Sequence, residues 1–337
     1  MKNKCVLCAL AVFVVVGLCG GSSADIVTNG LVLYLDAANY VPDSQVWMDQ
    51  SGLANDGILG DSNEVDIWDP SLIKDVYRSG PDSDPNYKEV KAMCFTFGDK
   101  NPGNGSIVRI PMADSLDLGS FADNSANFTV EMWAKNTCHY RYQWLLDYRT
   151  YIEDPCNPNI ISRVSGFILR GFEPGEVAAE VTDVNGNTSR TRSLATDWPD
   201  PVWKHITVTV DSTTDVLDIY MNSMWSVNVT SYQGGDLSMM KDALTPDREG
   251  EFIGMGRGIV PKATTILPSL ARIAVLRVYN RVLSEAEIIQ NYEAGFNLPV
   301  TYGCSELIKG DLDSDCDADF SDFAIMADNW LKDNFIN

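Results

Sequence analysis

The chain has 337 residues, 45% of them hydrophobic, and a formal net charge of −22. This length allows one large domain with its own core and a small second one. A strongly negative protein is repelled by nucleic acid and by anionic lipid, so both are excluded as expected partners. The charge suits a protein outside the cell that remains in solution or binds calcium.

Residues 1–24 have the pattern of a secretory signal peptide. Lys2 and Lys4 form a basic start, residues 6–18 form an apolar run, and small residues at 22–24 precede the expected cleavage before Asp25. The apolar run is shorter than the roughly 20 residues that a membrane span needs. We therefore expect a protein that is secreted or held at the cell surface, without a membrane span in the mature chain. An uncleaved membrane anchor is the alternative.

Short segments typical of β-strands recur from residue 31 to residue 279. At 128–134, Phe128, Val130 and Met132 alternate with residues of the opposite face, and the same period of two recurs at 206–211. The other expected strands are 31–35, 94–97, 106–110, 144–148, 166–170, 176–182, 216–221, 225–229, 251–254 and 270–279. Many short strands with almost no helix predict an all-β fold, an antiparallel β-sandwich of two sheets.

Two segments rich in turn-forming residues interrupt this pattern. Residues 47–60 contain many Asp, Asn and Gly residues, and we predict a loop dominated by turns. Residues 61–92 are rich in Asp, Pro and Ser. We expect this second segment to form an insertion at one end of the sandwich.

One helix is predicted at about 285–294. Ser284 is a favourable N-cap, and Glu287 three residues later completes a capping box. Leu283 and Ile288 occupy the positions of a hydrophobic staple, and Gly295 can end the helix.

Five cysteines remain after removal of the signal peptide, and an oxidising compartment favours disulfides between them. Cys304 and Cys316 are close in sequence and flank the acidic tail, so we expect them to pair. Cys138 with Cys156 is the second expected pair, which leaves Cys94 as a buried free thiol. The sequence alone does not determine this connectivity.

Six segments share the pattern of one family. They are LVLYLD at 31–36, DQSGLANDG at 49–57, NFTVEMWAK at 127–135, WKHITV at 203–208, DIYMN at 218–222 and ARIAVLRVYNRVLSEAEIIQNY at 271–292. Together they resemble the laminin-G-like family of secreted bacterial proteins over residues 31–298. The resemblance implies a concanavalin A-like jelly roll with about a dozen strands in two sheets. Family members include sugar binders, adhesion modules and domains attached to enzymes, so the fold does not determine the function.

The acidic tail resembles one repeat of a dockerin. Six aspartates occupy loop positions 1, 3, 5, 7, 9 and 12 of residues 311–322, and they are Asp311, Asp313, Asp315, Asp317, Asp319 and Asp322. Calcium prefers oxygen ligands at this spacing. The resemblance implies one bound calcium ion, with Asp317 contributing its backbone carbonyl and Asp319 a water.

The tail departs from the dockerin pattern in two ways. Cys316 stands where the loop usually has Gly, and only one repeat is present, so cohesin binding is not implied. The helix after the loop places Phe323, Met326 and Trp330 on one apolar face, which needs either the sandwich or another extracellular protein as partner. We therefore divide the chain into a signal peptide at 1–24, the sandwich at 25–299 and the tail at 300–337; a disordered acidic tail is the alternative.

A catalytic hypothesis rests on EVDIWD at 64–69. It resembles the "E-x-D-x-x-E" strand of laminarinase-type glycoside hydrolases, which implies Glu64 and Asp66 as the paired carboxylates. Asp69 replaces the final Glu, and the motif lies in the insertion instead of on a central strand. His205 resembles a structural histidine of the family, and we expect it to be packed and hydrogen-bonded. No catalytic residue is therefore assigned.

We expect a secreted, non-catalytic module that recognises a polysaccharide or glycoconjugate. The alternatives are a structural or adhesive scaffold component and, third, a hydrolase that uses Glu64 and Asp66. Aromatic side chains can stack on sugar rings, and Trp133 and Trp203 are assigned to strands of the fold. The tryptophans that remain open as sugar contacts are Trp47, Trp68, Trp144, Trp198 and Trp225.

Overall fold

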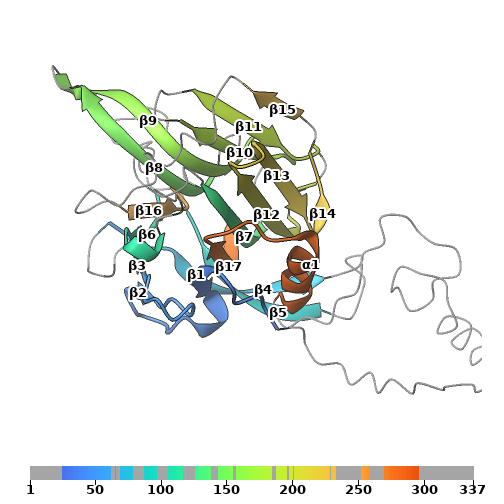
Figure 1. Cartoon of the computed structure of the whole chain (residues 1–337). Coiled ribbons are helices and arrows are strands. Elements are labelled where there is room, and N and C mark those ends of the chain that lie inside the picture. Colours follow the sequence, from blue (N-terminus) through green and yellow to red (C-terminus); the bar gives the residue numbers. More distant parts are fainter. Residues whose placement is uncertain are drawn as a thin grey trace, which may run out of the picture.

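In the computed structural model, the chain forms two antiparallel β-sheets packed face to face (Figure 1). The structure describes residues 25–61, 65, 69–78, 87–96, 105–116, 118, 126–137, 143–154, 157–183, 187–195, 197–199, 201–227, 229–232, 252–257 and 269–295. Within these ranges the sheets contain eight and nine strands, which confirms the predicted all-β sandwich. The expected signal peptide and tail lie outside the described residues.

Sheet A contains eight strands. Seven follow one another in the order β14 (Met224–Trp225), β13 (Val216–Met221), β12 (Trp203–Asp211), β7 (Asn127–Lys135), β17 (Arg272–Tyr279), β5 (Tyr87–Cys94) and β4 (Ser71–Arg78). The eighth strand, β1 (Leu31–Asp36), also pairs with β17. This order brings the family segments at 127–135, 203–208, 218–222 and 271–279 into one sheet.

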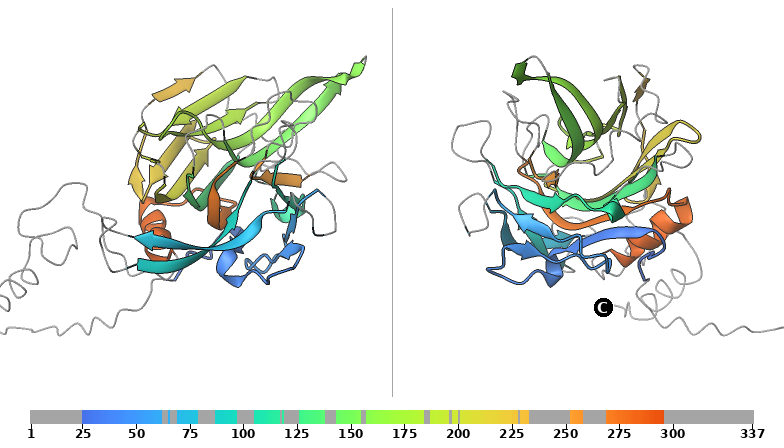
Figure 2. Two further views of the ribbon diagram at one scale, coloured as in Figure 1. Left: turned by 180° about the vertical axis from the view of Figure 1, so that it is seen from behind. Right: turned by 60° about the vertical axis from the view of Figure 1, so that its left-hand side comes forward.

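Sheet B contains nine strands. Their order is β15 (Val229–Tyr232), β11 (Thr188–Arg192), β10 (Val177–Thr182), β9 (Asn157–Gly171), β8 (Trp144–Asp154), β16 (Phe252–Met255), β6 (Val108–Pro111), β3 (Gly57–Leu59) and β2 (Val46–Trp47). Strands β8 and β9 form a long hairpin that extends beyond the other strands (Figure 2). Two 3-10 helices, η1 (Ala37–Asn39) and η2 (Asp114–Leu116), lie in the connections.

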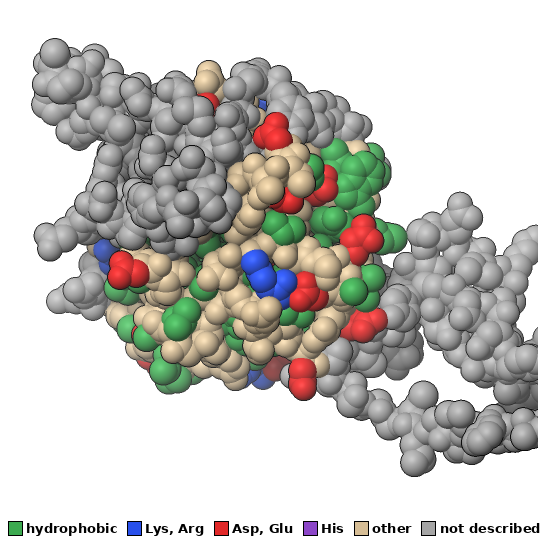
Figure 3. All heavy atoms as spheres, viewed as in Figure 1, with side chains coloured by type: hydrophobic (Ala, Val, Ile, Leu, Met, Phe, Trp, Pro, Cys, Tyr) green, Lys and Arg blue, Asp and Glu red, His purple; other side chains and the backbone are tan. Residues whose placement is uncertain are grey.

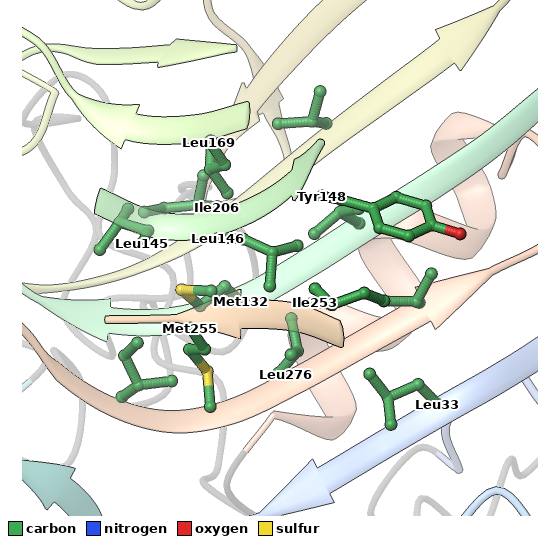
Figure 4. Close-up of a cluster of buried hydrophobic side chains, with 14 of the residues drawn as sticks. Leu33, Met132, Leu145, Leu146, Tyr148, Leu169, Ile206, Ile253, Met255 and Leu276 are labelled. Carbon is green, nitrogen blue, oxygen red and sulfur yellow. The ribbon is translucent and has the colours of Figure 1, made fainter. Parts of the chain in front are cut away.

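The hydrophobic core lies between the inner faces of the two sheets (Figure 4). Met132, Ile206 and Leu276 enter it from sheet A, and Leu146 and Leu169 enter it from sheet B. The alternation predicted for 128–134 is confirmed, because Phe128, Val130, Met132 and Ala134 all belong to this core. Burial of apolar area between the sheets is the main stabilising contribution, at roughly 25 cal/mol per Å² removed from water.

The outer face of sheet A is also covered. The helix α1 (Glu285–Ala294) packs over it, and Tyr292 stacks on Trp133 with ring centroids 5.5 Å apart (Figure 1). Ser284 and Glu287 form the predicted capping box. Leu283 and Ile288 are buried in one cluster, as the predicted hydrophobic staple requires. The helix is confirmed at 285–294, and it explains why residues on both faces of β7 are buried.

The loop after β1 is organised by one carboxylate. Asp49 Oδ1 accepts hydrogen bonds from the backbone N–H groups of Tyr34 and Ser51, at 2.8 and 2.9 Å, and its Oδ2 accepts one from Asn55 N at 2.9 Å. Asn55 in turn donates from Nδ2 to the Val32 carbonyl at 2.7 Å. The family segment at 49–57 is therefore a structural loop that attaches itself to the first strand of sheet A.

Several strand predictions were wrong. The expected loop at 47–60 contains part of β2 and all of β3, and the expected insertion at 61–92 contains β4 and most of β5, a hairpin that extends sheet A. The strand expected at 94–97 ends at Cys94, and the segment 225–229 contains the ends of two strands that belong to different sheets. Strand β11 was not predicted. These strands are short or polar, and local sequence does not show their pairing with distant segments, such as Ile58 with Arg109.

Candidate functional site

Three ionisable side chains are enclosed between sheet A and α1. Glu131, His205 and Arg277 are each at most 1% exposed. Glu131 Oε1 lies 3.5 Å from His205 Nε2, and Glu131 Oε2 lies 3.8 Å from Arg277 Nη1. Asn291 of α1 completes this buried polar cluster by donating from Nδ2 to Glu131 Oε2 at 2.7 Å.

His205 has the packed position that was expected, but not the expected hydrogen bonds. Its ring lies 5.2 Å from the Trp133 ring and 5.7 Å from the Tyr292 ring, measured between centroids. Neither ring nitrogen has a hydrogen-bond partner within the described residues. Burial, followed by the charge of Glu131, raises the pKa of the neighbouring Tyr279 hydroxyl well above its usual value. Because all three side chains are enclosed in the fold, the cluster offers no exposed surface to a ligand.

The other predicted site residues are placed as follows. The carboxylates Glu64 and Asp66, the pair Cys138 and Cys156, the pair Cys304 and Cys316, and the six aspartates of the calcium loop lie outside the described residues. Cys94 is free, as predicted, but half-buried instead of buried. Asp69 accepts a hydrogen bond from Gln45 Nε2 at 2.8 Å. Within the described ranges no three His, Cys, Asp or Glu side chains converge as metal ligands.

The tertiary structure shows which of the candidate sugar-contacting tryptophans are buried and which are exposed. Trp47 and Trp198 are buried in the core, at 0% and 1% exposure, and so cannot contact a sugar. Trp144 is half-buried, and the guanidinium of Arg149 lies 4.6 Å from its ring centroid. Trp225 is 59% exposed. Among the described tryptophans Trp225 is the most exposed, and Trp68 lies outside the described residues.

A tight hairpin positions Trp225. Strands β13 and β14 are joined by Asn222 and Ser223, whose φ angles of 52° and 63° are typical of a two-residue type I′ turn. The hairpin pairs Trp225 with Tyr220, so both side chains lie on the outer face of sheet A, and Asp218 shares that face because it is two residues from Tyr220. Trp225 Nε1 donates a hydrogen bond to Asp218 Oδ1 at 3.0 Å.

We call Trp225 and Asp218 the tryptophan platform. The hydrogen bond fixes the indole at an exposed edge of sheet A, where Figure 3 shows hydrophobic side chains gathered next to acidic ones. An exposed aromatic ring can cover the apolar face of a sugar ring, while a carboxylate beside it can accept hydrogen bonds from sugar hydroxyls. The strands expected at 216–221 and 225–229 lie close enough in sequence to form a hairpin, but the sequence did not show which face is open.

Comparisons with known proteins agree with this architecture. Residues 112–289 match the family described as the concanavalin A-like lectin/glucanases superfamily. No curated protein matches the chain. In the part of the chain that the structure describes, no helix is long and apolar enough to span a membrane.

The solved structures that resemble this chain include three structures of two binding domains. The binding domain of Paraclostridial Mosquitocidal Protein 1 is 14% identical, with a TM-score of 0.44, and the match covers 79% of this chain and 52% of that one. The binding domain of Botulinum neurotoxin DC in complex with rat synaptotagmin II is 10% identical, with a TM-score of 0.45, over 80% of this chain and 52% of that one. The same domain in complex with SialylT is 11% identical, with a TM-score of 0.44, over 79% and 52%. This chain thus spans about half the length of these structures.

Proposed function

The chain belongs to the concanavalin A-like lectin/glucanases superfamily, and on this premise we propose that it is a secreted, non-catalytic module that binds a polysaccharide or glycoconjugate. The superfamily contains binding proteins and enzymes, so the site and not the fold must decide between them. The observation that carries the proposal is the exposed and oriented indole of Trp225.

The tryptophan platform favours a neutral sugar. A ring that is already fixed by Asp218 loses little conformational freedom on binding, and this lowers the entropic cost of the complex. Burial raises the pKa of Tyr220, and the nearby carboxylates of Asp218 and Glu285 raise it further. These two carboxylates give the platform acidic neighbours. A negative surface repels uronic acids and sulfated sugars. Neutral polysaccharides are therefore the ligands that the platform would accept.

The non-catalytic part of the proposal rests on the incomplete carboxylate motif. Glycosidases of this architecture require two carboxylates that flank the scissile bond. In this chain Asp69 stands where the laminarinase pattern has Glu, and Asp69 is engaged with Gln45. Incubation with laminarin should release no reducing sugar. Release that disappears in Glu64→Gln would show that the protein is an enzyme.

The binding proposal is tested by affinity electrophoresis on neutral polysaccharides such as laminarin, xyloglucan and galactomannan. We expect Trp225→Ala to weaken binding at least tenfold, about 1.4 kcal/mol, and Trp225→Phe to retain part of it. Met224→Ala is the matched control, because Met224 is 53% exposed on the same short strand. The free energies of unfolding of both Ala variants should lie within about 0.5 kcal/mol of the wild-type value, since surface substitutions have small effects.

Two results would count against the proposal. Undiminished binding by Trp225→Ala would move the sugar site away from the platform. Absence of binding to every polysaccharide, together with ordered self-assembly, would favour the structural or adhesive alternative.

A further inference from the structure

Four arginines lie together on the outer face of sheet B, although the chain has a net charge of −22. Arg149 is on β8, Arg170 on β9, and Arg190 and Arg192 on β11 (Figure 1). We call these four residues the arginine cluster. Successive side chains of a strand point to opposite faces. The residues next to the arginines are accordingly buried on the inner side of the strands: Leu169, Ser189 and Thr191.

The strand register brings three of these arginines side by side. Ala178 of β10 pairs with Arg170 on one side and with Arg192 on the other. Glu180, two residues further along β10, pairs with Arg190. Since neighbouring strands are about 4.8 Å apart, Arg170 and Arg192 are separated by roughly 10 Å of sheet whose only intervening side chain is the methyl group of Ala178.

Each arginine of the cluster has an acidic partner. Asp147 neutralises Arg149 through two hydrogen bonds of 2.6 and 2.7 Å. Glu180 Oε1 is shared by Arg170 and Arg190, and Glu176 Oε2 lies 3.2 Å from Arg192 Nη1. In these pairs, three guanidinium groups share two carboxylates.

One aromatic ring holds the same three cations together. The guanidinium carbons of Arg170, Arg190 and Arg192 lie 5.3, 5.0 and 5.1 Å from the centroid of Phe172. The negative faces of aromatic rings attract cations at this distance, but the three like charges also repel one another. An anion bound among them would remove this repulsion.

Arg190 and Arg192 are the members that can reach a ligand. Their side chains are 30% and 27% exposed, whereas those of Arg149 and Arg170 are 14% and 12% exposed. Within the described residues Arg190 donates only through Nε and Arg192 only through Nη1. They lie two residues apart on one strand, about 6.8 Å, and point to the same side. Guanidinium groups with unused N–H donors bind carboxylates and sulfates through paired hydrogen bonds.

We propose that the arginine cluster is a second ligand site, which binds the carboxylate or sulfate group of an acidic polysaccharide. It lies on sheet B, whereas the tryptophan platform lies on sheet A, so each site can bind without the other. The strongly negative remainder of the protein prevents non-specific attraction of polyanions. Binding of a polyanion therefore has to come from the exposed guanidinium groups of Arg190 and Arg192.

The test measures binding of the full chain to polygalacturonate, dextran sulfate and neutral dextran by calorimetry at low ionic strength. We expect at least one of the two polyanions to bind, at least tenfold more tightly than neutral dextran. The double variant Arg190→Gln/Arg192→Gln should weaken the interaction at least tenfold, and sodium chloride at about 1 M should abolish it because salt screens charges. Binding to polygalacturonate alone identifies the carboxylate as the ligand group, and binding to dextran sulfate alone identifies the sulfate.

Three further variants distinguish a specific arginine site from a general effect of charge. Arg192→Lys keeps the charge but removes the planar pair of donors, and should bind more weakly than wild type. Lys74→Gln removes one positive charge from an exposed position on sheet A and should bind normally. Trp225→Ala should also bind polyanions normally, even if it loses neutral sugars. Full polyanion binding by a folded Arg190→Gln/Arg192→Gln protein, or no polyanion binding by the wild type, would overturn the proposal.

Discussion

Asn291 on α1 and Glu131 on β7 are joined by a hydrogen bond of 2.7 Å from Asn291 Nδ2 to Glu131 Oε2. The same amide donates to the Tyr279 hydroxyl at 2.9 Å, and its Oδ1 accepts a hydrogen bond from the Val27 backbone N–H at 2.7 Å. Asn291 is fully buried. One side chain therefore connects the N-terminal segment, two strands of sheet A and the helix that covers them.

Replacement of Asn291 should be strongly destabilising. Asn291→Ala leaves the Val27 N–H and a buried carboxylate without this partner, and we expect a loss of roughly 2–3 kcal/mol in the free energy of unfolding. The measurement is urea unfolding, in which the midpoint should fall while the slope is unchanged. Ile289→Ala, on the exposed side of the same helix, is the control and should change stability by less than about 1 kcal/mol. Equal stability of the two variants would show that the amide does not anchor the helix.

Two glycines with positive φ should respond differently to substitution by alanine. Gly256 has φ 88°, and a Cβ added there would lie 2.0 Å from Cδ1 of Phe95, which is buried in the core. Gly52 has φ 91°, and an added Cβ would meet no atom within 4 Å. Gly52→Ala should cost about 1–2 kcal/mol through backbone strain alone. Gly256→Ala adds overpacking of the core and should cost at least about 3 kcal/mol in the same urea experiment.

The ion pair at the start of α1 should make stability depend on acid pH. Hydrogen bonds from Arg281, then from the Ser284 backbone N–H, lower the pKa of Glu287 to about 2 from its ordinary value of 4.5. A carboxylate with a lowered pKa contributes stability above its unfolded pKa and loses it as the pH falls through the folded pKa. The free energy of unfolding of the wild type should therefore exceed that of Glu287→Gln by about 1 kcal/mol at pH 7. This difference should vanish as the pH falls from 4.5 to 2. Glu285→Gln, which removes a charge from the same turn, should show a smaller difference.

Calcium should bind to the tail. Five carboxylates, those of Asp311, Asp313, Asp315, Asp319 and Asp322, repel one another within twelve residues unless a cation balances them. We expect calorimetry of the full chain to detect one calcium ion, and Asp311→Ala to lose it. Glu306→Gln, outside the loop, is the control and should bind as wild type does. Identical titrations of Asp311→Ala and wild type would leave the tail as an acidic spacer.

The sequence by itself determined the features that depend on residues close together in the chain. The helix at 285–294 was predicted with its cap because the bonds between Ser284 and Glu287 span a single turn. The alternation in β7 was also readable, because successive side chains of a strand point to opposite faces. The family segments added the arrangement of these elements into two sheets.

The tertiary structure alone decided which side chains can meet a ligand. Trp198 and Trp225 have similar turn-rich surroundings in the sequence, yet one is buried in the core and the other is exposed. The arginine cluster assembles from β8, β9 and β11, and β11 itself was missed because its polar sequence becomes a strand only by pairing with β10 and β15. Exposure and charge clustering arise from contacts between distant segments. Local sequence patterns contain no information about such contacts, so both proposed sites became visible only in the folded chain.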